Sequence, residues 1–180
     1  MVIGVDWKSA SWHAVGLAPW TPDGFMLSSH KAPRGTLDAK RQSLFAAFDS
    51  FLGAAVLVSQ SRQEPLHVFF EHPLALANGK TTLALGMAAG ALWAAHLGHD
   101  LWWHWVEVSS WAAMVGVSLG KDNTAERKAK SRAYAVEHLA LPPDLDEDHY
   151  DAANNGLWGR AELAKLPEAW KPEAVGVTDG

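Results

Sequence analysis

The sequence contains no cysteine, so disulfide bonds and thiolate metal sites are excluded. Charged residues are also few, at 19% against 48% hydrophobic residues, a balance that is typical of a globular chain rather than a disordered one. The N-terminus runs directly into an apolar stretch, without a basic region that precedes a separate hydrophobic segment. We therefore expect no secretory signal and a cytoplasmic protein.

The sequence also lacks a P-loop, a GxGxxG fingerprint and the Ser/His/Asp order of a hydrolase triad. His96, His99 and His104 cluster, but without the spacing of a zinc site. The length of 180 residues suits one domain. We place that domain at residues 1–165 and expect a loose tail, rich in Pro and Gly, at 166–180.

Thr81 to Leu97 is a stretch without any charged residue, near the lower length limit of a membrane span. Its Thr, Gly and His residues favour a buried or interface helix instead, so we expect no membrane partner. Gly86 and Gly90 have the GxxxG spacing that lets another backbone approach closely. Packing against the chain's own sheet and helix contact across a dimer both remain open.

Tryptophan is abundant, with ten residues, five of them between Trp93 and Trp111. We predict that they mainly fill the core around a buried strand. The alternative is that exposed rings form platforms on which nucleic-acid bases stack.

The order of predicted elements indicates the fold. Three short apolar stretches with turn residues between them predict an antiparallel meander, and apolar residues at helical spacing predict a helix after it. The expected strands are 2–7, 12–18, 25–30, 66–71 and 101–108, and the expected helices are 36–58, 79–98, 124–140 and 146–165. This order predicts an α/β protein with a ribonuclease H-like fold: a five-stranded mixed sheet, an antiparallel meander plus parallel strands, flanked by helices. In that fold the first and fourth strands are neighbours.

Four carboxylates follow these elements in a particular order. Asp6 and Glu71 each end a buried strand, and Asp148 and Asp151 lie three residues apart near the start of a late helix. Such residues can converge on one pocket, and an oxygen-only pocket suits hard ions such as Mg²⁺ or Mn²⁺. A pair of these ions clamps the attacking and leaving oxygens of a phosphodiester. The order therefore predicts a nuclease.

Each acid taken alone also has an ordinary structural explanation. Asp6 and Glu71 could cap turns, and acidic residues are common at helix N-termini because they cap the helix and complement its dipole. Asp148 and Asp151 share their helix face with Asn155, which favours a site over a cap. The four acids in order carry the prediction.

A basic segment precedes the acidic helix. Five of the fifteen Lys and Arg residues lie within twelve positions: Lys121, Arg127, Lys128, Lys130 and Arg132. Asn123 and Glu126 have capping-box spacing, which places a helix N-terminus inside the segment. The segment could be a solvated helix face, or it could contact a phosphodiester backbone.

The residues resemble the RuvC-like family of Holliday junction resolvases. The resemblance rests on Ile3-Gly4-Val5-Asp6, on Leu85 to Gly90, on Met114-Val115-Gly116-Val117, and on Asp148-His149-Tyr150-Asp151-Ala152, which is similar to the family's DxxDA. It implies a homodimeric endonuclease that acts on four-way junction DNA with Mg²⁺, for which Mn²⁺ substitutes, and two ions per site. Asp6, Glu71, Asp148 and Asp151 would be its metal-binding catalytic residues. The basic segment and Lys8, which replaces a small residue of the family, would contact DNA.

Three other functions remain open at this point. The catalytic domains of some ribonuclease H-like transposases share an opening Gly-Val-Asp-Trp and a DxxDA. An actin-like ATP-binding fold also ends its first strand in Asp, but Trp7-Lys8-Ser9 does not provide its Gly-rich phosphate turn. The protein could also bind junctions without cutting them.

Overall fold

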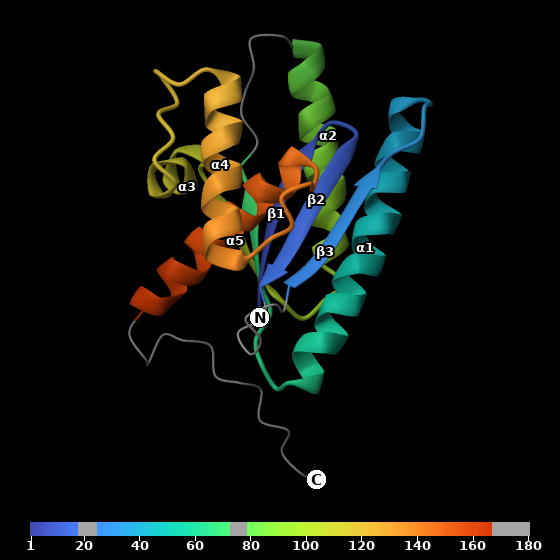
Figure 1. Cartoon of the computed structure of the whole chain (residues 1–180). Helices are drawn as coiled ribbons and strands as arrows, with labels where there is room; N and C mark the ends of the chain where they lie inside the picture. The colour runs from blue at the N-terminus through green and yellow to red at the C-terminus, as the bar shows by residue number, and fades with distance from the viewer. Residues whose placement is uncertain (18–24, 73–78, 167–180) are drawn as a thin grey trace.

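The computed structural model describes residues 1–17, 25–72 and 79–166, so the predicted tail lies outside the described residues except for Leu166. Figure 1 shows a central sheet with helices packed on both of its faces. The strands are β1 (Val2–Lys8), β2 (Ser11–Leu17), β3 (Phe25–Lys31), β4 (His67–Glu71) and β5 (Trp102–Val106). The helices are α1 (Leu37–Ser61), α2 (Gly79–His96), α3 (Val108–Met114), α4 (Thr124–Leu139) and α5 (Glu147–Lys165).

The sheet has the strand order β3-β2-β1-β4-β5. β1 and β3 pair with β2 antiparallel, while β4 runs parallel to both β1 and β5. The predicted five-stranded mixed sheet is confirmed, and β1 and β4 are neighbours as expected.

The sequence analysis was wrong about the segment after β5. Residue 106 ends the strand, and Val108–Met114 forms a helix that was not predicted. Its buried residues, Trp111 and Ala112, lie beside Val115 on the side that packs into the core. Seven residues with Val and two Ser have weak helix propensity and are too short to show a helical period, so tertiary packing determines this helix.

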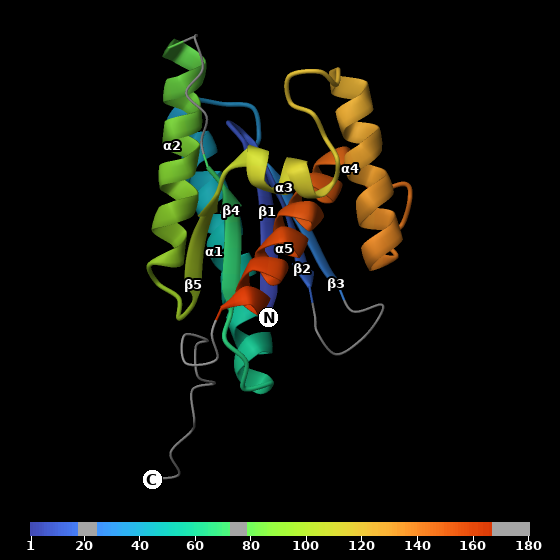
Figure 2. The same cartoon turned by 90° about the vertical axis from the view of Figure 1, so that its left-hand side faces the viewer.

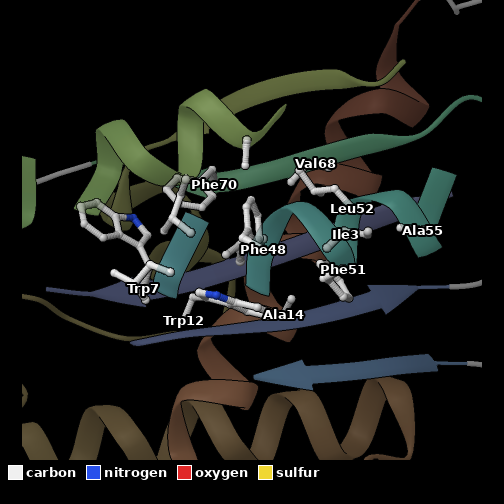
Figure 3. Packing of buried hydrophobic residues seen from close by; sticks show 14 of the residues in the cluster. Ile3, Trp7, Trp12, Ala14, Phe48, Phe51, Leu52, Ala55, Val68 and Phe70 are labelled. Carbon is white, nitrogen blue, oxygen red and sulfur yellow. The ribbon is translucent and has the colours of Figure 1, made fainter. Parts of the chain in front are cut away.

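One face of the sheet packs against α1 and α2. Figure 3 shows Phe48, Phe51 and Leu52 of α1 lying between the side chains of three strands, with Trp12 at one end. These positions recur every three or four residues, which is why the predicted amphipathic helix forms here. Leu37, the first residue of the same helix, is 37% exposed.

Helix α1 is, within the described residues, the helix long and apolar enough to cross a membrane by length and composition alone. Its buried stripe packs in the core cluster shown in Figure 3, and a core helix of this length has the same composition.

The other face packs against α5, and α3 and α4 both contact α5 (Figure 2). Helix α5 crosses β1 at very close range: a methyl group on Gly4 would collide with the carbonyl oxygen of Ala152 and the backbone of Gly156. Only glycine permits this approach. Near the end of α5, Ala161 and Ala164 are exposed, whereas Leu163 packs against the core.

The tryptophans divide between the core and the surface. Trp12 and Trp111 are buried, whereas Trp93, Trp102 and Trp105 are 43%, 54% and 40% exposed. The expectation that this cluster fills the core is therefore wrong for these three. Trp102 and Trp105 belong to β5, an edge strand, where side chains are covered on fewer sides than in a central strand.

Candidate active site

All four predicted acidic residues line one cavity of about 580 Å³. Asp6 and Glu71 lie side by side near the carboxyl ends of β1 and β4. These two strands are parallel and pair from Val2 opposite His67 to Val5 opposite Phe70. Asp148 and Asp151 reach the cavity from the first turns of α5. The opposite wall comes from α3, the loop after it and α4.

Asn155 holds the three elements together. Its side-chain NH₂ donates hydrogen bonds to the carbonyl oxygens of Val5 at 3.1 Å and Phe69 at 3.5 Å. These carbonyls belong to β1 and β4, close to Asp6 and Glu71. Because Asn155 lies one turn after Asp151, the same contact sets the position of the acidic helix face against both strand ends.

Asp6 and Glu71 are acids in an unfavourable environment. Burial, followed by the nearby charges of Glu71, Asp151 and Asp148, raises the pKa of Asp6 well above its usual value. Burial and then Asp151 raise the pKa of Glu71 to about 7, although a hydrogen bond from Trp111 opposes the shift. The two carboxylates repel each other when both are charged. A cation bound between them would offset the cost of burying their charge and would reduce the repulsion.

Two lysines supply positive charge to Asp148 and Asp151, the two acids on α5. Lys128 donates hydrogen bonds to Asp151 and, at 3.0 Å, to Asp148, and Lys8 donates to Asp148. Burial raises the pKa of Asp148, but hydrogen bonds from Lys8 and Lys128 outweigh it and lower that pKa overall. Burial lowers the pKa of Lys128, but the nearby carboxylates of Asp151 and Asp148 outweigh burial and raise that pKa overall.

Uncharged groups fix the remaining acid positions. Ser131 donates a hydrogen bond to Asp151, and the Asn154 side chain donates to the Ser131 hydroxyl and carbonyl, both at 2.9 Å. Trp111 donates to a Glu71 carboxylate oxygen at 3.4 Å, and Trp7 donates to the Glu71 carbonyl at 2.8 Å. The sequence analysis missed Ser131 and Trp111, because neither residue type indicates contact with an acid.

The donor set suits a divalent ion. Atoms of Asp6, His13 and Asp148 that can bind a metal lie within 4.8 Å of one another. The His13 Nδ1 atom is buried and has no hydrogen-bond partner among the described residues. The four carboxylates match the oxygen ligands that Mg²⁺ and Mn²⁺ use, and a histidine nitrogen is a ligand that transition-metal ions also accept. The sequence analysis missed His13, although its position in the hairpin opposite Asp6 could have identified it.

The basic segment divides into different environments. Arg127 and Lys128 line the cavity, and the Asn123–Glu126 capping box begins α4 beside them. Lys130 instead donates to Asp122 at 2.7 Å and to the Gly116 carbonyl at 3.1 Å, so it braces the loop before α4. Lys121 and Arg132 are exposed and do not line the cavity.

The described fold and site define a ribonuclease H-like protein with a cluster of acids at the ends of its two central strands. Among solved structures, the chain is similar to Thermus thermophilus RuvC, with a TM-score of 0.63 and 14% identity over 91% of this chain and 97% of that one. It is also similar to T. thermophilus RuvC in complex with a Holliday junction substrate, with a TM-score of 0.60 and 13% identity over 88% and 92% of the two chains. No protein-family model and no curated protein matches the sequence. The predicted resemblance to RuvC is thus confirmed at the level of the fold.

The raised pKa of Glu71 predicts that this acid destabilises the metal-free protein at neutral pH. An acid whose pKa is higher in the folded state stabilises that state below its unfolded pKa, and this contribution is lost as pH rises through about 7. Glu71→Gln should therefore raise the free energy of unfolding at about pH 8 by roughly 1 to 3 kcal/mol, and by almost nothing near pH 4. Urea denaturation in the presence of a chelator measures this.

Glu107→Gln is the matched control, because Glu107 lines the same cavity but is largely exposed. It should leave the pH dependence of stability unchanged. A stabilisation by Glu71→Gln that is equal at both pH values would point to packing rather than charge.

Proposed function

We propose that this protein is a structure-selective endodeoxyribonuclease that resolves four-way DNA junctions by metal-dependent paired nicking. The observation that carries the proposal is the convergence of Asp6, Glu71, Asp148 and Asp151 on one cavity of a RuvC-type fold. One of the similar RuvC structures is a complex with a Holliday junction substrate, which supports this class of DNA substrate.

In the proposed reaction the four carboxylates would hold divalent ions, Mg²⁺ or Mn²⁺ and in our proposal two per site. Bound ions of this kind would supply activation of the attacking water and stabilisation of the charge on the phosphate and the leaving oxygen. Because the pKa of Glu71 is raised, a bound cation would shift this acid toward its ionised form. Lys128, which contacts both helix acids, can transfer a hydrogen bond to a phosphate oxygen when DNA enters.

The DNA backbone would follow the positive side chains beside the cavity. Arg127 lines the cavity, Lys121 and Arg132 are exposed on or just before the same helix, and Lys8 lies at the end of β1. The net charge of −5 is no obstacle, because the acids that dominate the site would be neutralised by metal.

Paired nicks require two active sites, and we propose a homodimer related by a two-fold axis. The surface that suits a second copy is an apolar groove of about 400 Å³ between α1 and α2, on the face of the sheet opposite the acids. Gly90 lies in its wall, Phe45 beside it is 40% exposed, and Leu83 on α2 is 61% exposed. The GxxxG spacing is thus available for contact with another chain.

The first test replaces Asp6 with Asn and measures cleavage of a labelled four-way junction with Mg²⁺ or Mn²⁺. Loss of one ligand should slow cleavage by several orders of magnitude while junction binding persists, because the metal positions the reacting oxygens. Glu107→Gln, in the wall of the same cavity, should cleave normally.

Cleavage by Asp6→Asn at the wild-type rate would refute the proposed site. Wild-type protein that binds the junction but never cuts it would indicate a non-catalytic junction-binding protein. Joining of a DNA end to a new strand, rather than nicking, would indicate a transposase or recombinase.

The basic residues predict a salt dependence of DNA binding. Each phosphate contact releases counterions, so the Lys121→Ala/Arg127→Ala variant should reduce the slope of log affinity against log salt by about one to two. Arg160→Ala/Lys165→Ala removes the same charge from the far end of α5 and should leave the slope unchanged. Equal slopes for both variants and wild type would make the segment a solvated helix face.

The dimer is tested by Gly90→Leu. Among the described residues, no atom outside the neighbouring backbone of its own helix lies within 4 Å of a Cβ built on Gly90, so a variant with the larger side chain should fold normally but prevent close approach of a second helix. Light scattering should then show a monomer, thermal unfolding should change little, and paired nicking should fall. A wild-type monomer with full resolving activity would contradict the proposal.

A further inference from the structure

His13 lies directly opposite Asp6 in the antiparallel ladder between β1 and β2. Side chains of opposed residues project from the same face of a sheet, roughly 5 Å apart at their Cβ atoms. His13 therefore faces the acidic cluster rather than the α1 side of the sheet, and it is only 9% exposed. It was not among the residues predicted for the site.

The two ring nitrogens of His13 face different carboxylates. Nδ1 lies 3.8 Å from an Asp148 oxygen, and Nε2 lies 3.8 Å from an Asp146 oxygen. Both distances are too long for a hydrogen bond. Nδ1 is fully buried and has no hydrogen-bond partner in the part of the chain that the structure describes, a state that is unfavourable for a polar atom unless it has another function.

A shared metal ion accounts for this spacing. When two ligand atoms bind the same small divalent ion, each at about 2.1 Å from it, the two atoms lie roughly 3 to 4 Å from each other. The His13 and Asp148 atoms are in this range, and Asp6 completes a group within 4.8 Å. Asp146 faces the other nitrogen, as carboxylates do where they orient a histidine that binds metal.

We propose that His13 is a nitrogen ligand of the divalent ion held by Asp6 and Asp148, and that it gives this site a preference for Mn²⁺ over Mg²⁺. Imidazole nitrogen suits transition-metal ions, whereas Mg²⁺ strongly prefers oxygen. The proposal rests on the metal-dependent function proposed above. It adds a ligand from β2 to the four acids.

His149 is the histidine with which His13 must be compared. Its ring packs edge-on against the His13 ring, with centroids 4.8 Å apart, and its own Nδ1 is also buried without a partner. His149 does not belong to the group of metal-binding atoms that contains Asp6 and Asp148 within the described residues. His149 therefore contacts His13 without joining that group, and it serves as the matched control.

Lys8 contacts the Asp148 oxygen that faces His13. Lys8 is the last residue of β1 and its side chain is 58% exposed, so the side chain can swing toward solvent when an ion binds. This exchange of one cation for another leaves the charge on Asp148 compensated in both states.

Pulsed electron paramagnetic resonance of the full-length protein loaded with Mn²⁺ tests the ligand directly. The wild type should show coupling to a directly bound ¹⁴N nucleus, and incorporation of ¹⁵N-histidine should convert it to ¹⁵N coupling. His13→Gln should abolish the coupling, and His149→Gln should retain it. Titration should show that His13→Gln weakens Mn²⁺ binding by about tenfold or more, and Mg²⁺ binding by much less.

The outcomes separate this inference from the proposed function. Mn²⁺ binding and junction cleavage without histidine coupling would overturn the role of His13 alone. Coupling that His149→Gln removes would assign the ligand to His149 instead and also overturn the proposal. Absence of Mn²⁺ binding in the wild type, together with absence of cleavage, would refute the proposed function itself. The isotope experiment uses the wild type, so it decides on histidine ligation even where His13→Gln fails to fold.

Discussion

The contact between α5 and β1 is the constraint on which the site depends. Gly4 has no side chain, so the backbone of α5 at Ala152 and Gly156 lies against the backbone of β1. Asp6 is two residues along the strand, and Asp148 and Asp151 lie within one turn of Ala152. A larger residue at position 4 would push the helix away from the sheet and separate the helix acids from the strand acids. The glycine of an opening apolar strand is thus as much part of the site as the acids.

This close packing creates an electrostatic conflict. Burial and mutual repulsion raise the pKa of Asp6 and of Glu71, so the folded chain carries these acids at the expense of stability. Lys8 and Lys128 compensate the helix acids, but within the described hydrogen bonds neither donates to Asp6 or Glu71. The strand acids are consequently the ones for which a bound cation would change the energy most. Proteins commonly accept such strain where chemistry requires it.

Much of the fold followed from sequence because its signals are local. The apolar stripe of α1 and the capping box of α4 each depend on neighbours in the chain, and the structure has both of them. Helix α3 could not be predicted in this way, because tertiary contacts of Trp111 determine it. The placement of the acids was predictable from the strand order. The contacts of the acids with Lys128 and Ser131, and of Ser131 with Asn154, were not, because they depend on how α4 packs against α5.

The sheet separates two tasks by the alternation of its strands. Along β1, residues 3, 5 and 7 enter the core with α1 and α2, while residues 4, 6 and 8 face α5 and the cavity. By the same alternation on β2, Trp12 and Ala14 lie in the core that α1 and α2 cover, and His13 faces Asp6. A shift of one residue in the hairpin would exchange these sets, burying Asp6 in an apolar core. The register that stabilises the core therefore also sets the positions of Asp6 and His13. The two-residue turn between Lys8 and Ser11 fixes this register, so the core and the site both depend on it.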